Sequence, residues 1–141
     1  MSLYVDTSVL VAALTKEAET ARMQAWLAAQ TADALFISTW VVTEFSAALS
    51  MKLRSGALGA EHRATALSAF AQLCENNLTI LDITPLDFRK AATFADQAQA
   101  GLRAGDALHL AICAEHGSRL CTLDRRLSEA GLMLGVTTML L

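Results

Sequence analysis

Five short apolar runs along the chain predict the strands of a β-sheet. Each run is rich in valine, isoleucine, leucine or threonine, and each is too short to form a helix of ordinary length. The predicted strands are Leu3–Val5, Leu35–Ser38, Leu78–Ile83, Arg119–Leu123 and Val136–Met139.

Longer segments with the composition and periodicity of helices separate these runs. Because strands and helices alternate, the pattern predicts the α/β class, with a mainly parallel sheet covered by helices on both faces. Glycines and small polar residues place the clearest loops at Arg54–Gly59 and Ala98–Gly105. The predicted helices are Ser8–Leu14, Thr20–Ala29, Thr39–Arg54, Ala60–Glu75, Pro85–Gln99, Gly105–His116 and Leu127–Gly131.

The composition fits a single folded domain spanning residues 1–141. Apolar residues make up 54% and charged residues 18%, a balance that argues against disorder. The net charge of −3 argues against a surface that binds nucleic acid by charge alone, although a local basic patch stays open. The three cysteines, Cys74, Cys113 and Cys121, show no paired spacing, which favours reduced thiols and a cytoplasmic location. We expect no secretory signal and no membrane-spanning segment.

The opening stretch LYVDTSVLV sets one acid and two hydroxyls inside an apolar run. This acid, Asp6, directly follows the first predicted strand, and Asp124 follows the fourth. Open parallel sheets bind ligands beyond the carboxyl ends of their strands, so both positions are candidates for function. The alternative for each is an N-cap, since aspartate is favoured at the start of a helix.

Two further acids lie where an ordinary surface acid is not expected. A helical wheel puts Glu44 on the apolar face of its helix, where a carboxylate is costly unless a cation or hydrogen-bond donors satisfy it. The alternative is a partner lysine or arginine, or a pocket rim open to solvent. Asp106 lies in the first turn of a helix that is apolar nearly all round, where capping is the alternative. The apolar neighbours of Glu44 on the wheel are Val41, Ala47, Ala48 and Met51.

Four carboxylates at one edge of a sheet would repel one another unless a divalent cation neutralised them. Oxygen-only ligand sets suit Mg²⁺ or Mn²⁺, which bind substrate phosphates and activate water for phosphodiester hydrolysis. We therefore predict a magnesium or manganese site formed by Asp6, Glu44, Asp106 and Asp124. The side chain of Thr122 should point to the same face of the strand as that of Asp124.

The sequence also offers a competing metal site, because His109, Cys113 and His116 share one face of a predicted helix. Imidazole and thiolate suit zinc, but no fourth ligand is evident, so packed side chains are the favoured interpretation of His109 and Cys113. Glycine-rich phosphate loops and the nucleophile elbow of hydrolases are missing from the sequence, which argues against those classes.

The segments LYVDTSVLVAAL, TEFSAAL, LRAGDALHLAIC and LCTLDRRL resemble the PIN domain, and within it the VapC toxins of bacterial type II toxin–antitoxin modules. The resemblance runs over essentially the whole chain. It implies a three-layer α/β/α sandwich with a short parallel sheet, and a metal-dependent endoribonuclease. The acidic quartet of the family maps onto Asp6, Glu44, Asp106 and Asp124, and its hydroxyl positions map onto Thr7 or Ser8 and onto Thr122.

The resemblance also implies partners. Family members are usually dimers, usually cut structured RNA such as tRNA or rRNA, and are blocked by a cognate antitoxin. We expect Arg103, Arg125 and Arg126, which flank two of the acids, to contact phosphates, with solvated or ion-paired arginines as the alternative. The alternative function is a PIN-like module that binds RNA or protein without cutting, and the intact quartet argues against it. The sequence does not separate DNA from RNA as the substrate.

Overall fold

The computed structural model describes residues 1–141 and contains one five-stranded sheet in which every neighbouring pair of strands is parallel. The order across the sheet is β3-β2-β1-β4-β5, so β1 lies at the centre. The parallel sheet predicted from the sequence is therefore confirmed. The strands are β1 Leu3–Val5, β2 Leu35–Ser38, β3 Thr79–Leu81, β4 Arg119–Thr122 and β5 Thr138–Leu140.

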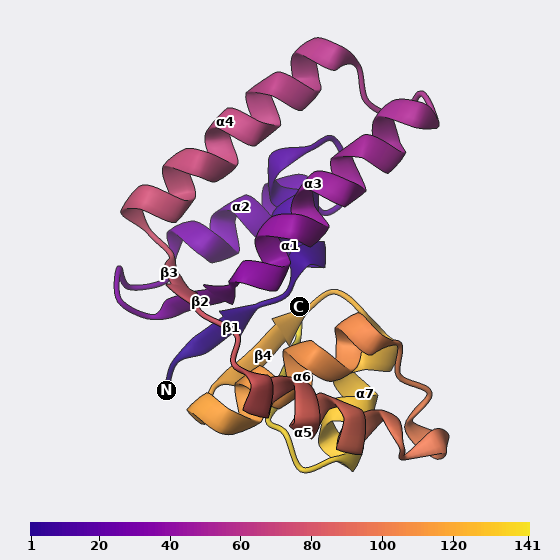
Figure 1. Ribbon diagram of the computed structural model, residues 1–141. Helices are drawn as coiled ribbons and strands as arrows, with labels where there is room; N and C mark the ends of the chain where they lie inside the picture. Colours follow the sequence, from indigo (N-terminus) through magenta and orange to yellow (C-terminus); the bar gives the residue numbers. More distant parts are fainter.

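Seven α-helices cover the two faces of the sheet and give three layers (Figure 1). From β1 the chain crosses to β2 and then β3 in one direction, and from β3 it returns past β1 to β4 and β5. Because crossovers between parallel strands are right-handed, this reversal puts the first four helices on one face and the last three on the other. The helices are α1 Thr7–Leu14, α2 Thr20–Ala28, α3 Thr39–Arg54, α4 Ala60–Asn76, α5 Pro85–Ala95, α6 Ala104–His116 and α7 Arg125–Met133.

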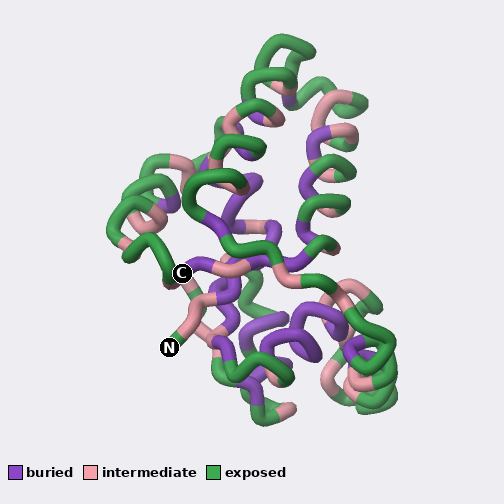
Figure 2. The backbone as a smooth tube through the Cα atoms, turned by 60° about the vertical axis from the view of Figure 1, so that its left-hand side comes forward, coloured by how far each residue is buried: buried purple, intermediate pink, exposed green.

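The hydrophobic core is one continuous cluster that joins both helical layers to the sheet. Helix α6 is its most buried helix, with every residue from Ala107 to Cys113 buried, as its nearly all-apolar sequence predicts. The α3–α4 hairpin extends away from the sheet, and its turn is exposed (Figure 2). None of the helices is both long and apolar enough to cross a membrane.

The buried face of α3 differs from the one drawn on the helical wheel. The structure buries Val41, Phe45 and Leu49, whereas Met51 is 61% exposed and Ala47 is exposed as well. The outer half of α3 packs on α4 rather than on the sheet. A helical wheel drawn over the whole helix therefore puts the centre of the buried face in the wrong place. Glu44 therefore lies at the border of the buried stripe, with its side chain 30% exposed.

Several element boundaries also differ from the prediction. Helix α5 ends at Ala95 instead of Gln99, and a single 3₁₀ turn at Ala98–Ala100 follows it. Alanine and glutamine continue the helical composition past this point, but the backbone of Gln97 leaves the helical region at ψ 84°. Strand β3 is shorter than expected, β5 begins two residues later, and α7 extends from Arg125 to Met133.

The strand order creates a topological switch point between β1 and β4. Their carboxyl ends lie side by side, with Val5 paired to Cys121, while the chain leaves the two strands toward opposite faces of the sheet. Such a point opens a crevice at the carboxyl edge, which is where open α/β sheets bind ligands. Asp6 follows β1 directly, and Asp124 follows β4 after one residue, Leu123.

Candidate active site

Asp6 is held by hydroxyl groups at the end of β1. Its Oδ2 atom accepts hydrogen bonds from Ser8 Oγ at 2.6 Å and from Thr122 Oγ1 at 2.7 Å. It occupies the N-cap position of α1 but makes no side-chain capping bond, so the capping alternative is wrong for this residue. Asp6 is only 6% exposed, and no hydrogen bond reaches its Oδ1 atom. One oxygen of this buried carboxylate is therefore left for a ligand.

Glu44 reaches the same point from the first half of α3. Its Oε1 atom accepts a hydrogen bond from Thr7 Oγ1 at 2.7 Å and another from His109 Nε2 at 2.6 Å. Burial alone would raise the pKa of Glu44, but the hydrogen bond from His109, the imidazole charge and the bond from Thr7 together lower it. No hydrogen bond is formed by its other oxygen, Oε2, which lies on the side of Gly105 and Trp40, and Trp40 also lowers the pKa of Glu44. Glu44 lines an open groove of about 650 Å³.

His109 completes this cluster and is the site residue that the sequence analysis did not predict as functional. Ligand atoms of Asp6, Glu44 and His109 all lie within 4.8 Å of one another. His109 Nε2 is 3.6 Å from Asp6 Oδ1. Burial lowers the pKa of His109, but the bond to Glu44 and the nearby carboxylates of Asp6 and Asp106 more than offset this and raise it. A polar residue inside the apolar run of α6 was the signal for this role.

The zinc arrangement considered for α6 does not form. His109 and Cys113 are buried and His116 is exposed at the end of the helix, and these three residues do not gather into a metal-binding group. His109 instead faces the two acids. The favoured interpretation of Cys113 as a packed side chain is confirmed.

Asp106 and Asp124 lie together beside this cluster rather than inside it. Both line a small polar pocket of about 90 Å³ with Arg103 and Arg126. The four acids thus fall into two neighbouring groups at this edge, Asp6 and Glu44 with His109 and Asp106 with Asp124, and the charges of Asp6 and His109 act on Asp106. Burial of Asp106, reinforced by the charges of Asp124 and Asp6, raises its pKa although the Arg103 N–H donates to it at 3.3 Å.

Asp124 does cap a helix. Its Oδ1 atom accepts from the backbone N–H groups of Arg126 and Leu127 at 2.9 and 3.2 Å. Thr122 links this acid to Asp6, since its Oγ1 accepts from the Asp124 N–H at 3.0 Å while donating to Asp6. The capping alternative is thus confirmed for Asp124, and it leaves the second carboxylate oxygen unbonded.

The three predicted arginines are all exposed, and none forms a salt bridge. Arg103 and Arg126 line the pocket with Asp106 and Asp124, whereas Arg125 does not. Arg126 extends toward Gly101, where an added Cβ would lie 3.5 Å from its Nη2 atom. Two of the three are thus beside the acids and one points elsewhere.

The donor set of the site fits a divalent cation. No lysine or arginine pairs with any of the four site acids, and the one imidazole beside Asp6 and Glu44, that of His109, carries at most one positive charge for two carboxylates. Buried carboxylates without a cationic partner are costly. Asp6 and Glu44 each present one free oxygen, which is the ligand type that Mg²⁺ and Mn²⁺ prefer.

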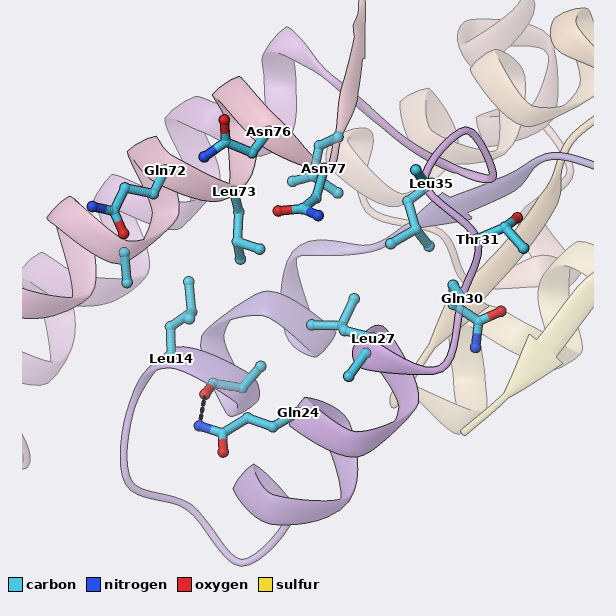
Figure 3. Close-up of a pocket in the computed structure, with 15 residues that line it drawn as sticks. Leu14, Gln24, Leu27, Gln30, Thr31, Leu35, Gln72, Leu73, Asn76 and Asn77 are labelled. Atoms are coloured by element: carbon cyan, nitrogen blue, oxygen red, sulfur yellow. Dashed lines mark hydrogen bonds between the residues drawn. The ribbon is translucent and has the colours of Figure 1, made fainter.

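A separate hollow of about 500 Å³ opens between α2 and α4, remote from these acids (Figure 3). Leucines project into it from both helices and from the end of α1, and carboxamides of glutamine and asparagine line the rest. It contains no acid, base or histidine. This hollow therefore offers no acid–base chemistry, unlike the carboxyl edge of the sheet.

Comparison with known families supports the interpretation of this edge. A model of the PIN domain matches residues 3–132. The chain belongs to the PIN domain family. Membership of this family supports a nuclease activity and agrees with a divalent-metal site at the acids. No protein of curated function matches the sequence significantly.

Solved structures share the PIN fold over nearly the full chain. VapC20 of Mycobacterium tuberculosis, described as a toxin that cleaves the sarcin–ricin loop, has a TM-score of 0.73 at 19% identity, covering 92% of this chain and 95% of its own. FitAcB of Neisseria gonorrhoeae has a TM-score of 0.71 at 17% identity, covering 97% and 96%. VapBC2 of Rickettsia felis, solved on a DNA fragment from its promoter, has a TM-score of 0.69 at 16% identity, covering 100% and 99%. At these identities the likeness establishes the fold alone.

Proposed function

We propose that this PIN domain is a metal-dependent endoribonuclease and the toxin of a VapC-type toxin–antitoxin pair. One observation carries the proposal. The buried carboxylate of Asp6 and the half-buried carboxylate of Glu44 meet at the switch point of the sheet, each with one oxygen bound by protein donors and one free, and no lysine or arginine neutralises them. A structural ion pair does not need this arrangement, whereas a cation site does.

The four acids hold the metal in this proposal. Mg²⁺ or Mn²⁺ supplies a Lewis acid that activates water and stabilises charge on the phosphodiester. Asp6 and Glu44 bind through their free oxygens, and Asp106 and Asp124 bind from the adjacent pocket, directly or through waters. The hydroxyls of Thr7, Ser8 and Thr122 fix the orientation of these carboxylates, because each donates to one of them.

Hydrolysis adds water across one P–O ester bond of the RNA. The attacking water gives up a proton to a neighbouring carboxylate, and the departing sugar oxygen takes up a proton as the bond breaks. Arg103 and Arg126 flank Asp106 and Asp124 and contact the phosphates of the strand, as side chains of this charge do in nucleic-acid complexes. Arg125, on the same helical turn but outside the pocket, contacts the strand further from the cut bond.

The partners follow from the same reasoning. The similar structures include toxin–antitoxin complexes from several bacteria, which supports a cognate antitoxin that covers the acids. The similar toxin that cleaves the sarcin–ricin loop supports a structured RNA, either rRNA or tRNA, as the substrate. We also propose a homodimer that works in the cytoplasm, where its three cysteines stay reduced.

Cleavage of labelled RNA tests the proposal. The chain, purified free of antitoxin, is incubated with total tRNA and with a sarcin–ricin loop oligonucleotide in Mg²⁺, in Mn²⁺ and in EDTA, beside Asp106→Asn. Specific cuts that need metal and are lost in the variant support the nuclease. Tight RNA binding without cutting in any metal favours the alternative, a non-catalytic PIN-like module that binds RNA or protein.

A further inference from the structure

His109 is a buried polar residue to which the proposed hydrolysis gives no role. It lies in the middle of α6 and is 1% exposed, surrounded by the apolar core. A leucine or phenylalanine would fill this volume without the cost of burying an imidazole. Both ring nitrogens are nevertheless hydrogen-bonded, one toward the core and one toward the acids.

The bond toward the acids has a fixed direction. Because a carboxylate only accepts, the Nε2–H of His109 donates to Glu44 Oε1 over 2.6 Å. Charge-assisted bonds of this kind are short and strong. Thr7 donates to the same oxygen from α1, so Oε1 is occupied by two donors and Oε2 is left over.

The bond toward the core anchors the ring. His109 Nδ1 lies 2.7 Å from the hydroxyl of Tyr4, and this hydroxyl lies 2.7 Å from Ser38 Oγ. Tyr4 belongs to β1 and Ser38 to β2, so the imidazole is tied to two strands of the sheet. The hydroxyl of Tyr4 is able to donate to Nδ1 or to accept from it, so the tether is kept in either protonation state of the ring.

Space on the other side of Glu44 is limited by Gly105. A Cβ atom at this position would lie 3.2 Å from Glu44 Oε2 and 3.1 Å from Trp40 Nε1, both tighter than ordinary contact. The carboxylate of Glu44 therefore sits between a hydrogen-bonded anchor and a backbone that only glycine leaves open. The hydrogen bonds to Oε1 on one side and the Gly105 backbone on the other therefore restrict where Glu44 Oε2 lies.

We propose that Tyr4 and His109 are positioning residues that hold Glu44 Oε1 and so aim Oε2 at the cation. The inference rests on the proposed function, because it concerns the same acids. Neither residue touches RNA, since both are buried. Their loss should therefore lower kcat and metal affinity while leaving the KM for RNA unchanged. A general loss of folding would also lower the apparent kcat, but it would lower the stoichiometry of Mn²⁺ binding and not the affinity, so the affinity separates the two.

Three variants test the hydrogen bonds from Tyr4 to His109 and from His109 to Glu44. Tyr4→Phe keeps the ring and removes the hydroxyl, His109→Leu removes both bonds, and His109→Gln keeps an N–H donor toward Glu44. A fourth variant, Thr15→Val, is the control. Thr15 is a buried hydroxyl bonded to the Val11 carbonyl on the far end of α1. Each variant is measured for RNA cleavage, for Mn²⁺ affinity by calorimetry and for thermal stability. In the metal-free protein, the ¹⁵N signals of the His109 ring are recorded in the wild type and in Glu44→Gln.

We expect His109→Leu to lower kcat and Mn²⁺ affinity by about 10–100-fold and Tyr4→Phe by about 3–10-fold, as loss of the partners behind a metal ligand does. His109→Gln should recover part of the loss, Thr15→Val should match the wild type, and Glu44→Gln should shift the ring signals. Wild-type kcat and Mn²⁺ affinity in both His109→Leu and Tyr4→Phe would overturn this inference but not the proposed function. Unchanged ring signals in Glu44→Gln would do the same. A wild-type chain that neither cuts RNA nor binds Mn²⁺ would overturn the proposed function first.

Discussion

Thr122, the last residue of β4, donates a hydrogen bond of 2.7 Å to Asp6, the residue that follows β1. The two residues are far apart in the sequence but sit on neighbouring strands at the switch point of the sheet. Thr122 is fully buried and also accepts from the backbone of Asp124. This hydroxyl therefore joins the two strand ends that carry acids, in addition to the backbone bond from Asp6 N–H to the Cys121 carbonyl.

The raised pKa of Asp106 predicts that the wild-type acid destabilises the metal-free protein. Burial and the charges of Asp124 and Asp6 raise this pKa, so the folded chain holds the proton more tightly than the unfolded chain. The free energy of unfolding therefore falls as pH rises from the ordinary pKa of aspartate through the raised folded value. Asp106→Asn should raise the Tm at pH 7 by about 1–3 °C without metal.

Thermal unfolding between pH 3.5 and pH 7 in EDTA checks this prediction. The stabilisation by Asp106→Asn should grow as the pH rises, because only the wild type acquires the buried charge. Asp33→Asn, an exposed aspartate in a loop, is the matched control and should not change the Tm. A variant that is less stable than the wild type at pH 7 would contradict the electrostatic account of Asp106.

Two substitutions of Asp124, to asparagine and to alanine, should separate its role as the cap of α7 from its proposed role as a metal ligand. Its Oδ1 atom caps α7, and asparagine caps as well as aspartate does. We expect Asp124→Asn to keep the free energy of unfolding within about 0.5 kcal/mol of the wild type, and Asp124→Ala to lose about 1 kcal/mol. Both should lose metal-dependent cleavage. Urea unfolding beside the RNA assay measures this, and full cleavage by Asp124→Asn would make this acid a cap only.

The three cysteines should differ in their reaction with iodoacetamide. Burial raises the pKa of Cys121 to about 11 and raises that of Cys113 as well. At pH 8 only about one in a thousand Cys121 side chains is then a thiolate. Burial also raises the pKa of Cys74, but this thiol is partly exposed on α4. Mass spectrometry of the native chain should find Cys74 labelled first, and early labelling of Cys113 or Cys121 would show that the core opens readily.

The fold was largely predictable because its elements are set by local patterns. The strands Leu3–Val5 and Leu35–Ser38 and the helix Thr39–Arg54 were predicted with the bounds that the structure has. Helices separate every strand from the next, which leaves a parallel sheet with two helical layers as the expected result. The end of α5 was missed because the chain leaves the helix where its composition is still helical. The division into a single domain over residues 1–141 stays a prediction.

The site was predictable only in its acids. Asp6 and Asp124 were identified because each follows a predicted strand. Glu44 and Asp106 were identified because each is an acid in a largely apolar helical segment. The role of His109 depends on Tyr4, which lies at the other end of the chain, and no local pattern indicates that contact. The hydroxyls of Thr7, Ser8 and Thr122 donate hydrogen bonds to the acids, and their assignment to the hydroxyl positions of the family stays a prediction. The assignment of the four acids as metal ligands stays a prediction.

The central claim is that Asp6 and its neighbours bind the cation that makes the chain cut RNA. The most direct measurement follows Mn²⁺ binding by calorimetry and RNA cleavage on the same preparations of wild type and Asp6→Asn. Asparagine keeps an oxygen that Ser8 and Thr122 are able to bind, so the variant should fold. The account predicts that binding and cleavage rise together with Mn²⁺ in the wild type and that both are lost in Asp6→Asn. Cleavage by the variant at the wild-type rate, or cleavage by the wild type in EDTA, would contradict it.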